Sequence, residues 1–481
     1  MNFGVNLLGR VTQFALQLIM LRLVTTLLDK TEAALLFVTL LIAGAASLLL
    51  ISPIGQYFNR HLLEFENQRR VSLQLFSFIG YAACVSPFVI AISILYFGMQ
   101  EETFVDWKVH AVSACYFFAT TLNQVCTSGL NVLGRSREFV IYSVMTQLLI
   151  LALISGLNLI GASHLGWLIC LVVANIIVGC CACYSLLDGS HSALYSANQR
   201  AHWFAGIPLE AEKAWKFGRH VLIALLCVWT YQVGFRFELL PLIGAKEFAL
   251  FSMGYSLAAV LFSGSEQILN SFCLPIYYKK AGSESPRLAW EWLARICLPT
   301  YLVALIVAFS LSDVLVVVFF DKSYLDASFY VRVGAMFEFL RVVHSLFAAH
   351  SHGLKKTDLL TKPAICGALV FLGGHLSLYN SPSATGLFVL VFCSACIATG
   401  YLIYTYAHSS QKVSLDTSTI YKLVPFGILT LILSEMIPNE LTVLAAFGYL
   451  SVAAVISFVF WVYVVWDIVT EIVTLEAARR R

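Results

Sequence analysis

The chain has few charged residues for its length. Asp, Glu, Lys and Arg make up 12% of its 481 residues, whereas hydrophobic residues make up 59%. A soluble globular protein has roughly 25% charged and 45–50% apolar residues. So little charge leaves too little polar surface for water, which excludes an ordinary soluble domain and indicates that lipid is the main solvent.

The chain also lacks an excess of either charge. It has 30 Lys and Arg against 27 Asp and Glu, and this balance gives no sign of a nucleic-acid partner. The 13 cysteines lie mostly inside apolar runs, which fits reduced thiols rather than a disulfide framework. Cys180, Cys181 and Cys183 lie close together without a neighbouring ligand in an aqueous loop, so we expect no structural metal and no cofactor.

Catalytic and processing motifs are missing as well. The sequence has no nucleophile elbow, phosphate-cradling glycine loop or zinc-ligand helix at a usable position. The first apolar segment lacks a small-residue cleavage site, so we expect no cleavable signal peptide.

What the chain does contain is a long series of apolar stretches. A helix of about 20 apolar residues crosses a bilayer. We predict an all-α, polytopic integral membrane bundle with spans near 3–27, 32–57, 72–98, 109–132, 138–160, 164–187, 217–242, 247–277, 290–318, 327–351, 360–380, 384–407, 420–437 and 441–467.

Positive charge is distributed unevenly over the loops between these spans. Lys and Arg concentrate in alternate loops and in the C-terminal tail, whereas the loops on the other side hold only Lys30, Lys108, Lys246 and Lys322. By the positive-inside rule the richer side is cytoplasmic. We therefore predict a multi-pass protein with both termini in the cytoplasm.

An internal repeat divides the chain. Arg22 and Phe37, which flank the first turn between spans, recur at the same spacing as Arg236 and Phe251. Both copies start from the same side, which predicts a parallel repeat about an axis along the membrane normal. We predict two six-helix lobes and two further C-terminal helices, with boundaries 1–190 (first lobe), 191–215 (cytoplasmic linker), 216–408 (second lobe) and 409–481 (extra spans and basic tail).

Several charged residues fall inside the predicted spans. A charge at bilayer depth costs several kcal/mol and therefore usually faces a protein interior or a water-filled cavity. Guanidinium groups bind phosphate through a planar fork of donors, which predicts a cationic lumen for a phosphate-bearing substrate. The candidates are Arg10, Arg22, Arg236, Arg332 and Arg341.

Acidic and amide side chains lie in the same spans. Glu238, Glu266 and Glu338 are candidates for coupling or for charge pairing with the arginines. Asn123, Gln124 and Asn131 lie along the fourth span, where amides either contact sugar hydroxyls or form hydrogen bonds between helices.

Four local segments resemble one known family. The segments Asn6–Arg10, Leu21–Val24, Ser52–Arg60 and Asn131–Arg135 resemble O-antigen flippases of the Wzx type. That family belongs to the multidrug/oligosaccharidyl-lipid/polysaccharide exporter superfamily. The resemblance implies a transporter, not an enzyme. It would carry undecaprenyl-pyrophosphate-linked oligosaccharide across the bacterial inner membrane by alternating access, for O-antigen, lipopolysaccharide or related surface polysaccharide. Its implied partners are the lipid-linked oligosaccharide, membrane lipids and surface-polysaccharide assembly proteins.

Two alternatives remain open. A multidrug extruder of the same superfamily would need an acidic and aromatic site for cationic substrates. Glu266 and Glu338 are acidic residues inside the predicted spans and are consistent with such a site. A membrane-embedded glycan polymerase or ligase would need a sizeable outward loop with catalytic residues, whereas every outward loop predicted here is short.

Overall fold

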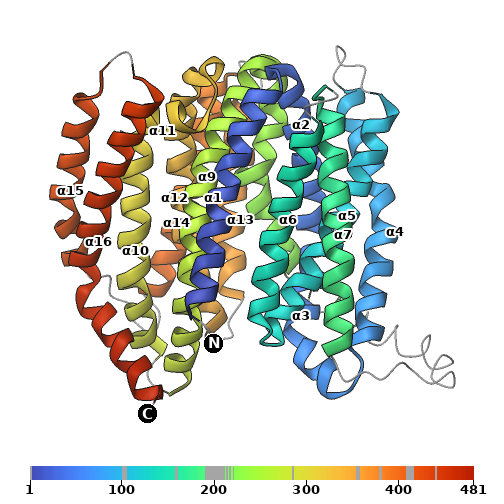
Figure 1. Ribbon diagram of the computed structural model, residues 1–481, viewed down its shortest axis with the longest axis horizontal. Helices are drawn as coiled ribbons and strands as arrows, with labels where there is room; N and C mark the ends of the chain where they lie inside the picture. The colour runs from blue at the N-terminus through green and yellow to red at the C-terminus, as the bar shows by residue number, and fades with distance from the viewer. Residues whose placement is uncertain are drawn as a thin grey trace. The chain divides into compact units, whose positions relative to one another are not determined.

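The computed structural model describes residues 3–99, 106–157, 161–189, 221–283, 286–353, 358–378, 382–407, 417–438 and 441–480, together with residues 212, 215, 218 and 219. These residues form helices joined by short connections, and this part of the chain contains no β-strand. Within each part of the molecule the helices run up and down beside one another (Figure 1). The predicted all-α class is confirmed.

The helices follow the predicted spans in order. They are α1 (Phe3–Leu27), α2 (Lys30–Ala46), α3 (Ser52–Asn67), α4 (Val71–Gly98), α5 (Trp107–Val132), α6 (Ser136–Leu157), α7 (His164–Gly189), α9 (Phe235–Ser283), α10 (Pro286–Ser310), α11 (Ser312–Phe319), α12 (Ser328–Gly353), α13 (Asp358–Leu378), α14 (Ala384–Ala407), α15 (Thr417–Glu435) and α16 (Val443–Arg480). Shorter elements are the π-helices η1 (Ser47–Ile51) and η3 (Thr230–Gly234) and the 3₁₀-helix η4 (Lys322–Ala327).

Most of these helices are long and apolar enough to cross a membrane. Ten helical stretches meet this condition among the described residues, and one of them, Val221–Leu274, covers most of both the seventh and the eighth predicted spans. The predicted spans in α5, α12 and α15 fall outside the ten. In α5 and α12 the reason is polar residues such as Asn123 and Glu338, which lower the hydropathy but are buried against protein. The chain is therefore a multi-pass membrane protein.

Three boundaries differ from the prediction. The second helical stretch continues to Asn67, because buried apolar residues recur after 57 at helical spacing in α3. The ninth predicted span is interrupted at Leu311 (φ −108°, ψ 22°), so that α11 is a separate short helix. The last helix continues to Arg480, since no Gly or Pro follows Gly448 to end it.

The turn in each copy of the repeat has its own local cause. Asp29 is extended (φ −68°, ψ 167°), and its carboxylate accepts hydrogen bonds from the backbone N–H groups of Thr31 and Glu32, which starts α2. Gly244 adopts φ 77°, ψ 165° and breaks α9 between the seventh and eighth predicted spans. Both interruptions follow shortly after the arginine of the repeat.

The chain forms two compact units. The first comprises Met1–Leu16 and Leu27–Ala249, and the second comprises Gln17–Thr26 and Leu250–Arg481. Helix α1 thus contributes its N-terminal part to the first unit and its C-terminal part to the second. The lobe boundaries inferred from the sequence stay a prediction.

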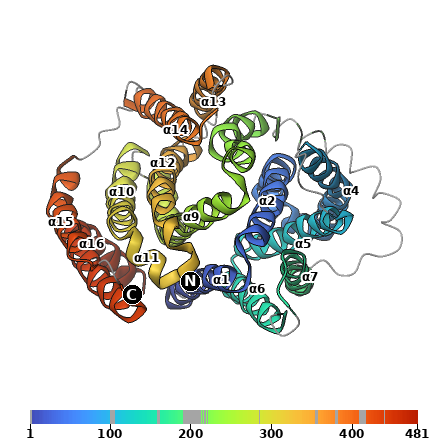
Figure 2. The same cartoon turned by 90° about the horizontal axis from the view of Figure 1, so that it is seen from above.

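Helix α5 is the centre of the first unit, where it lies between α2, α4 and α7 (Figure 2). The buried Asn123 side chain donates hydrogen bonds to Thr146 Oγ1 of α6 (3.1 Å) and to Asn175 Oδ1 of α7 (2.8 Å). Gly179 lets α7 approach closely, because a Cβ there would lie 3.1 Å from the Asn123 backbone nitrogen. Small residues and interhelical amide bonds are the usual way to join helices in lipid.

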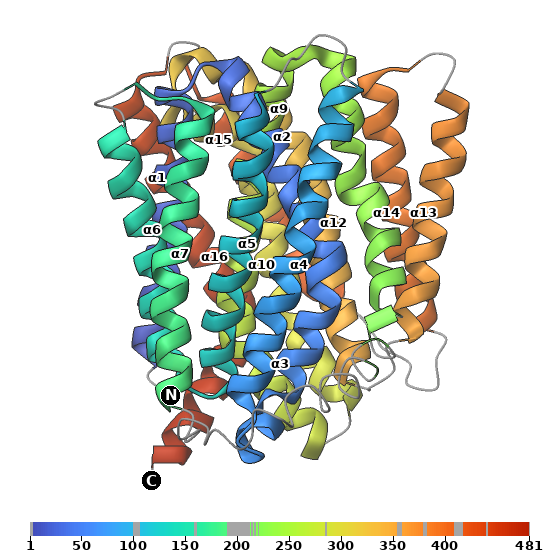
Figure 3. The ribbon, with the colours of Figure 1, turned by 90° about the vertical axis from the view of Figure 1, so that its right-hand side faces the viewer.

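The second unit is built around α9, α10, α12 and α14. Its core contains large buried side chains such as Trp290, Tyr301 and Phe262. Helices α13 and α14 lie side by side at one edge (Figure 3). Helix α16 packs against α10 and α11, and Trp461 donates a hydrogen bond to Thr300 Oγ1 (2.8 Å). The two extra C-terminal helices therefore belong to this unit.

Candidate functional site

A cavity of about 520 Å³ lies inside the first unit. One wall is the continuous stretch from α2 through η1 to α3, and the other wall is α5. We call it the neutral cavity, because no charged residue is found among the described residues that line it. Its polar lining residues are Ser47, Ser52, Gln56, Asn59, Tyr116, Thr120, Thr121, Gln124 and Ser128.

The remaining lining residues are apolar or small. They are Leu40, Ala43, Gly44, Leu48, Ile51, Gly55 and Val125. A hydroxyl- and amide-lined hollow is costly to keep in a membrane protein, because polar groups in an apolar medium lose the hydrogen bonds that water would give them. The composition of the wall therefore marks this hollow as a candidate ligand site.

The π-helix η1 shapes one wall of the neutral cavity. Single π-helical turns are rare and occur frequently at functional sites. The Tyr81 hydroxyl donates a hydrogen bond to the Leu50 carbonyl oxygen (2.9 Å), which satisfies a backbone acceptor in this distorted stretch. Pro53 follows at the start of α3, and because the helix continues from η1 without a break, its missing N–H removes one helical hydrogen bond in this stretch.

Two internal hydrogen bonds hold polar side chains of the wall. Gln56 Nε2 donates to Ser52 Oγ (3.3 Å), and Ser128 Oγ donates to Asn59 Oδ1 (3.4 Å). Both bonds are long for their type. The amides therefore keep donor and acceptor capacity for a ligand.

The three candidate amides of the fourth span have different positions. Gln124 is exposed and lies in the wall of the neutral cavity. Asn123 is buried and joins α5 to α6 and α7, as described above. Asn131 is exposed near the end of α5 and is not among the lining residues.

Most of the cavity wall was missed by sequence reasoning. The missed polar residues are Ser47, Ser52, Gln56, Asn59, Tyr116, Thr120, Thr121 and Ser128. A signal was present, because Tyr116, Thr120, Gln124 and Ser128 recur at every fourth position and so share one face of α5.

The second unit contains a partly buried charged network, which we call the Arg341 cluster. It consists of Arg341, Glu338, Glu266 and their hydroxyl partners. Arg341 donates from Nε to Glu338 Oε2 (2.6 Å) and from Nη1 to Glu266 Oε2 (2.9 Å). The sequence suggested the pairing of Arg341 with Glu338, and the fold brings Glu266 of α9 to the same guanidinium.

Hydroxyl groups complete the Arg341 cluster. Tyr255 donates to Glu338 Oε1 (2.7 Å), and Ser345 donates to Glu266 Oε1 (2.7 Å). Arg341 Nη2 donates to Ser263 Oγ (3.2 Å). Every carboxylate oxygen thus accepts a hydrogen bond. A phosphate would bind Arg341 only in competition with two carboxylates.

The other candidate charges are divided between the units. In the second unit, Arg332 donates to Ser312 Oγ (2.6 Å) and pairs with Asp313 (2.7 Å). Arg22 lies near Asp321, which precedes η4. A hydrogen bond from the Ser323 backbone and the charge of Arg22 hold the pKa of Asp321 below its usual value.

In the first unit, the candidate charges lie beside aromatic rings or at a helix start. The Arg10 guanidinium lies 4.8 Å from the Phe139 ring centroid and donates to Gln13 (3.0 Å). The Arg236 guanidinium lies 5.9 Å from the ring centroid of Phe235. Glu238 is half-buried in the first turn of α9.

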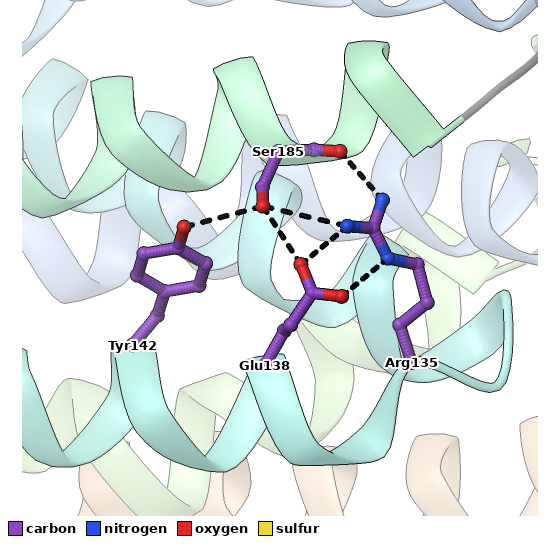
Figure 4. A network of polar contacts seen from close by, with 4 residues as sticks. All are labelled: Arg135, Glu138, Tyr142 and Ser185. Atoms are coloured by element: carbon purple, nitrogen blue, oxygen red, sulfur yellow. Dashed lines mark hydrogen bonds and ion pairs between the residues drawn. The ribbon is translucent and has the colours of Figure 1, made fainter.

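The segment Asn131–Arg135 has a structural role that its sequence did not indicate. Gly134 turns the chain at φ 77°, and Arg135 forms an ion pair with Glu138 (Figure 4). Arg135 Nη1 also donates to the Ser185 carbonyl oxygen of α7 (2.5 Å), and Ser185 Oγ donates to Glu138 (2.7 Å). Tyr142 completes this network through Ser185 Oγ (3.2 Å). The network joins the α5–α6 connection to the end of α7.

No protein-family model and no curated protein matches the sequence, but solved structures match the fold. A lipid II flippase, MurJ, in an inward closed conformation superimposes with a TM-score of 0.67 and 10% identity, over 97% of this chain and 99% of that one. An inward-facing multidrug resistance MATE family transporter of the MOP superfamily gives a TM-score of 0.58 and 12% identity, over 90% and 99% of the two chains.

These likenesses are structural, since so few residues are identical. They extend over nearly the whole of both compared chains, including the two C-terminal helices in the case of the flippase. The chain therefore shares its fold with this lipid II flippase and with this MATE family transporter.

Proposed function

We propose that this protein is a flippase that carries a polyprenyl-pyrophosphate-linked oligosaccharide across the bacterial inner membrane. The resemblance to Wzx-type proteins names undecaprenyl pyrophosphate as the carrier and an O-antigen or related repeat unit as the glycan. Alternating access is the expected mechanism, with both termini in the cytoplasm. Surface-polysaccharide assembly proteins are the expected partners.

The observation that carries this proposal is the lining of the neutral cavity. Its nine polar side chains are hydroxyls and amides, which both donate and accept hydrogen bonds. Sugar hydroxyl groups need that combination. A membrane protein that moved only apolar molecules would gain nothing from such a wall.

The pyrophosphate needs positive charge, and the intramembrane arginines provide it. Arg10, Arg22, Arg236, Arg332 and Arg341 are the proposed phosphate contacts, and at Arg332 and Arg341 a phosphate would compete with the carboxylates that already pair with them. Glu266 and Glu338 neutralise Arg341 and are the candidates for coupling, and Glu238 is the third acidic candidate. Gln124 is the favoured glycan contact among the amides proposed from the sequence, whereas Asn123 joins neighbouring helices and Asn131 lies outside the cavity wall.

The two alternatives are less well supported. An extruder of cationic drugs would place carboxylates and several aromatic rings at its site, whereas the described lining of the neutral cavity contains one aromatic residue, Tyr116, and no carboxylate. A polymerase or ligase would need catalytic residues on a substantial loop, and the described connections between helices are short.

Deletion of the gene in its native host tests the proposal. We expect the surface polysaccharide to disappear while the completed lipid-linked unit accumulates in the inner leaflet. Outer-leaflet units that are neither polymerised nor transferred would instead identify an enzyme of the same pathway. An unchanged glycan together with new drug sensitivity would identify an extruder.

Complementation of the deletion strain provides matched controls. Gln124→Ala removes an amide from the cavity wall, and Asn131→Ala removes an amide from the same helix outside it. We expect Asn131→Ala to restore the surface glycan and Gln124→Ala to restore it only in part. Equal restoration of the surface glycan by both variants would show that the neutral cavity does not contribute to transport.

A further inference from the structure

We propose that the neutral cavity holds an uncharged sugar residue of the transported glycan and excludes acidic sugars. This inference rests on the proposed function and adds a substrate class to it. It differs from the expectation of a uniformly cationic lumen. In this inference phosphate recognition and sugar recognition are carried by different groups.

The first support is the charge of the wall. A uronic acid placed in the cavity would bring a carboxylate into a site whose described lining has no cation. A carboxylate that loses part of its hydration in the cavity without gaining a cation is disfavoured. Arg60 follows the wall residue Asn59 along α3, but it is exposed, so water and salt weaken its field at the cavity.

The second support is an unsatisfied hydroxyl. Thr121 lies in the wall and is 2% exposed, and its Oγ1 has no hydrogen-bond partner within the described structure. Its neighbour Thr120 differs, because its hydroxyl donates to the Tyr116 backbone carbonyl oxygen (2.8 Å). A buried hydroxyl without a partner costs free energy. Because this oxygen is itself buried, a ligand hydroxyl would remove that cost only after the wall shifts to admit it.

The third support is the size and shape of the wall. Small-molecule sites are usually about 300–1,000 Å³, so a cavity of about 520 Å³ suits a short saccharide rather than a whole oligosaccharide. Amides of Gln56 and Gln124 lie on opposite walls, on α3 and α5. Tyr116 adds a ring on which the apolar face of a sugar can lie. The wall can therefore contact a sugar on several sides.

Transport of two matched lipid-linked disaccharides tests the inference. Both carry polyprenyl pyrophosphate and a proximal N-acetylglucosamine, and they differ only in a distal glucose or glucuronic acid. The purified full-length protein is reconstituted in vesicles, and a glucosidase or a glucuronidase outside the vesicles reports arrival in the outer leaflet. We expect the glucose compound to be transported at least about tenfold faster, because the glucuronate would lose hydration in the cavity without gaining a counter-ion.

Two variants sharpen the test. Gln124→Lys introduces a cation into the wall and is expected to reduce the preference for glucose by about tenfold, whereas Asn131→Lys, outside the wall on the same helix, leaves the preference unchanged. Thr121→Val keeps the side-chain shape and removes only the hydroxyl. It is expected to slow transport of the glucose compound several-fold without lowering the unfolding temperature.

The outcomes separate this inference from the proposed function. Transport of both compounds at equal rates, or faster transport of the glucuronate, overturns the inference and leaves the flippase in place. Transport of neither compound by the wild-type protein overturns the proposed function and the inference with it. A preference that Gln124→Lys and Asn131→Lys change equally overturns the assignment to this cavity.

Discussion

The neutral cavity of the first unit and the Arg341 cluster of the second differ in where their hydrogen bonds go. In the Arg341 cluster every carboxylate oxygen accepts a hydrogen bond from a side chain of the same unit. In the neutral cavity the amides make long internal bonds and Thr121 Oγ1 makes none in the described structure. Complete internal hydrogen bonding is typical of a polar cluster that stabilises the fold. Incomplete internal hydrogen bonding is typical of a site that binds a polar ligand.

Arg341→Met tests whether the Arg341 cluster stabilises the fold, and it should have the largest effect on stability. It leaves the carboxylates of Glu266 and Glu338 buried together without their counter-ion, which should destabilise the protein by about 3–5 kcal/mol. Chemical unfolding of the purified protein in detergent measures the loss. Arg332→Met is the matched control, because its pair with Asp313 is 41% and 54% exposed and should contribute under about 1 kcal/mol.

A triple variant provides a further check on the Arg341 cluster. Adding Glu338→Gln and Glu266→Gln to Arg341→Met removes the uncompensated charge and should recover most of the lost stability. Equal losses for Arg341→Met and Arg332→Met would show that the cluster is not the stabilising element described here.

Two adjacent amides of α5 should differ in the same way, one affecting stability and the other affecting transport. Asn123→Ala removes hydrogen bonds to α6 and α7 and should lower the free energy of unfolding by about 1–3 kcal/mol. Gln124→Ala should change stability by less than about 0.5 kcal/mol and slow transport instead. Unfolding and vesicle transport are measured on both variants. A larger loss of stability in Gln124→Ala, together with slower transport by a stable Asn123→Ala, would contradict the roles assigned to these two amides.

The contact between α5 and α7 supports the cavity wall and gives a third prediction. Gly179→Ala places a Cβ 3.1 Å from the Asn123 backbone nitrogen, so the helices must move apart at a cost of about 1–3 kcal/mol. Thermal unfolding measures the change. Gly80→Ala in α4 meets no atom within 4 Å and should leave the unfolding temperature unchanged or raise it slightly. Similar decreases in the unfolding temperature of both variants would show that the effect does not come from the contact between α5 and α7.

The network around Arg135 gives the smallest expected effect. The side chains of Arg135 and Glu138 are 25% and 34% exposed, so Arg135→Ala should cost about 1 kcal/mol or less. Arg137→Ala, two positions along and exposed, is the control and should cost less still. Unfolding in low and high salt separates the ion pair, which salt weakens, from the hydrogen bond to the Ser185 carbonyl oxygen.

Much of the helix order was predictable, because span length and apolar composition are local properties. The predicted first span, 3–27, matches α1 in both ends, and 384–407 matches α14. The ends of α3 and α16 were harder to predict, since helices that leave the membrane are no longer limited by its thickness.

The candidate site was less predictable than the helices. The sequence singled out polar residues inside spans, but it treated Asn123 and Gln124 alike. A difference of one residue turns a side chain by about 100° around the helix axis. One amide therefore faces neighbouring helices and the other faces the cavity.

The sequence alone predicted that this chain lies in lipid, that it crosses the membrane many times, and that its helices are interrupted shortly after Arg22 and Arg236. These features follow from local composition and backbone preference. The contact of Glu266 in α9 with Arg341 in α12, and the cavity between η1, α3 and α5 whose described lining is uncharged, became known from the packing of the helices. Such contacts join residues far apart in the chain, and helix packing sets them.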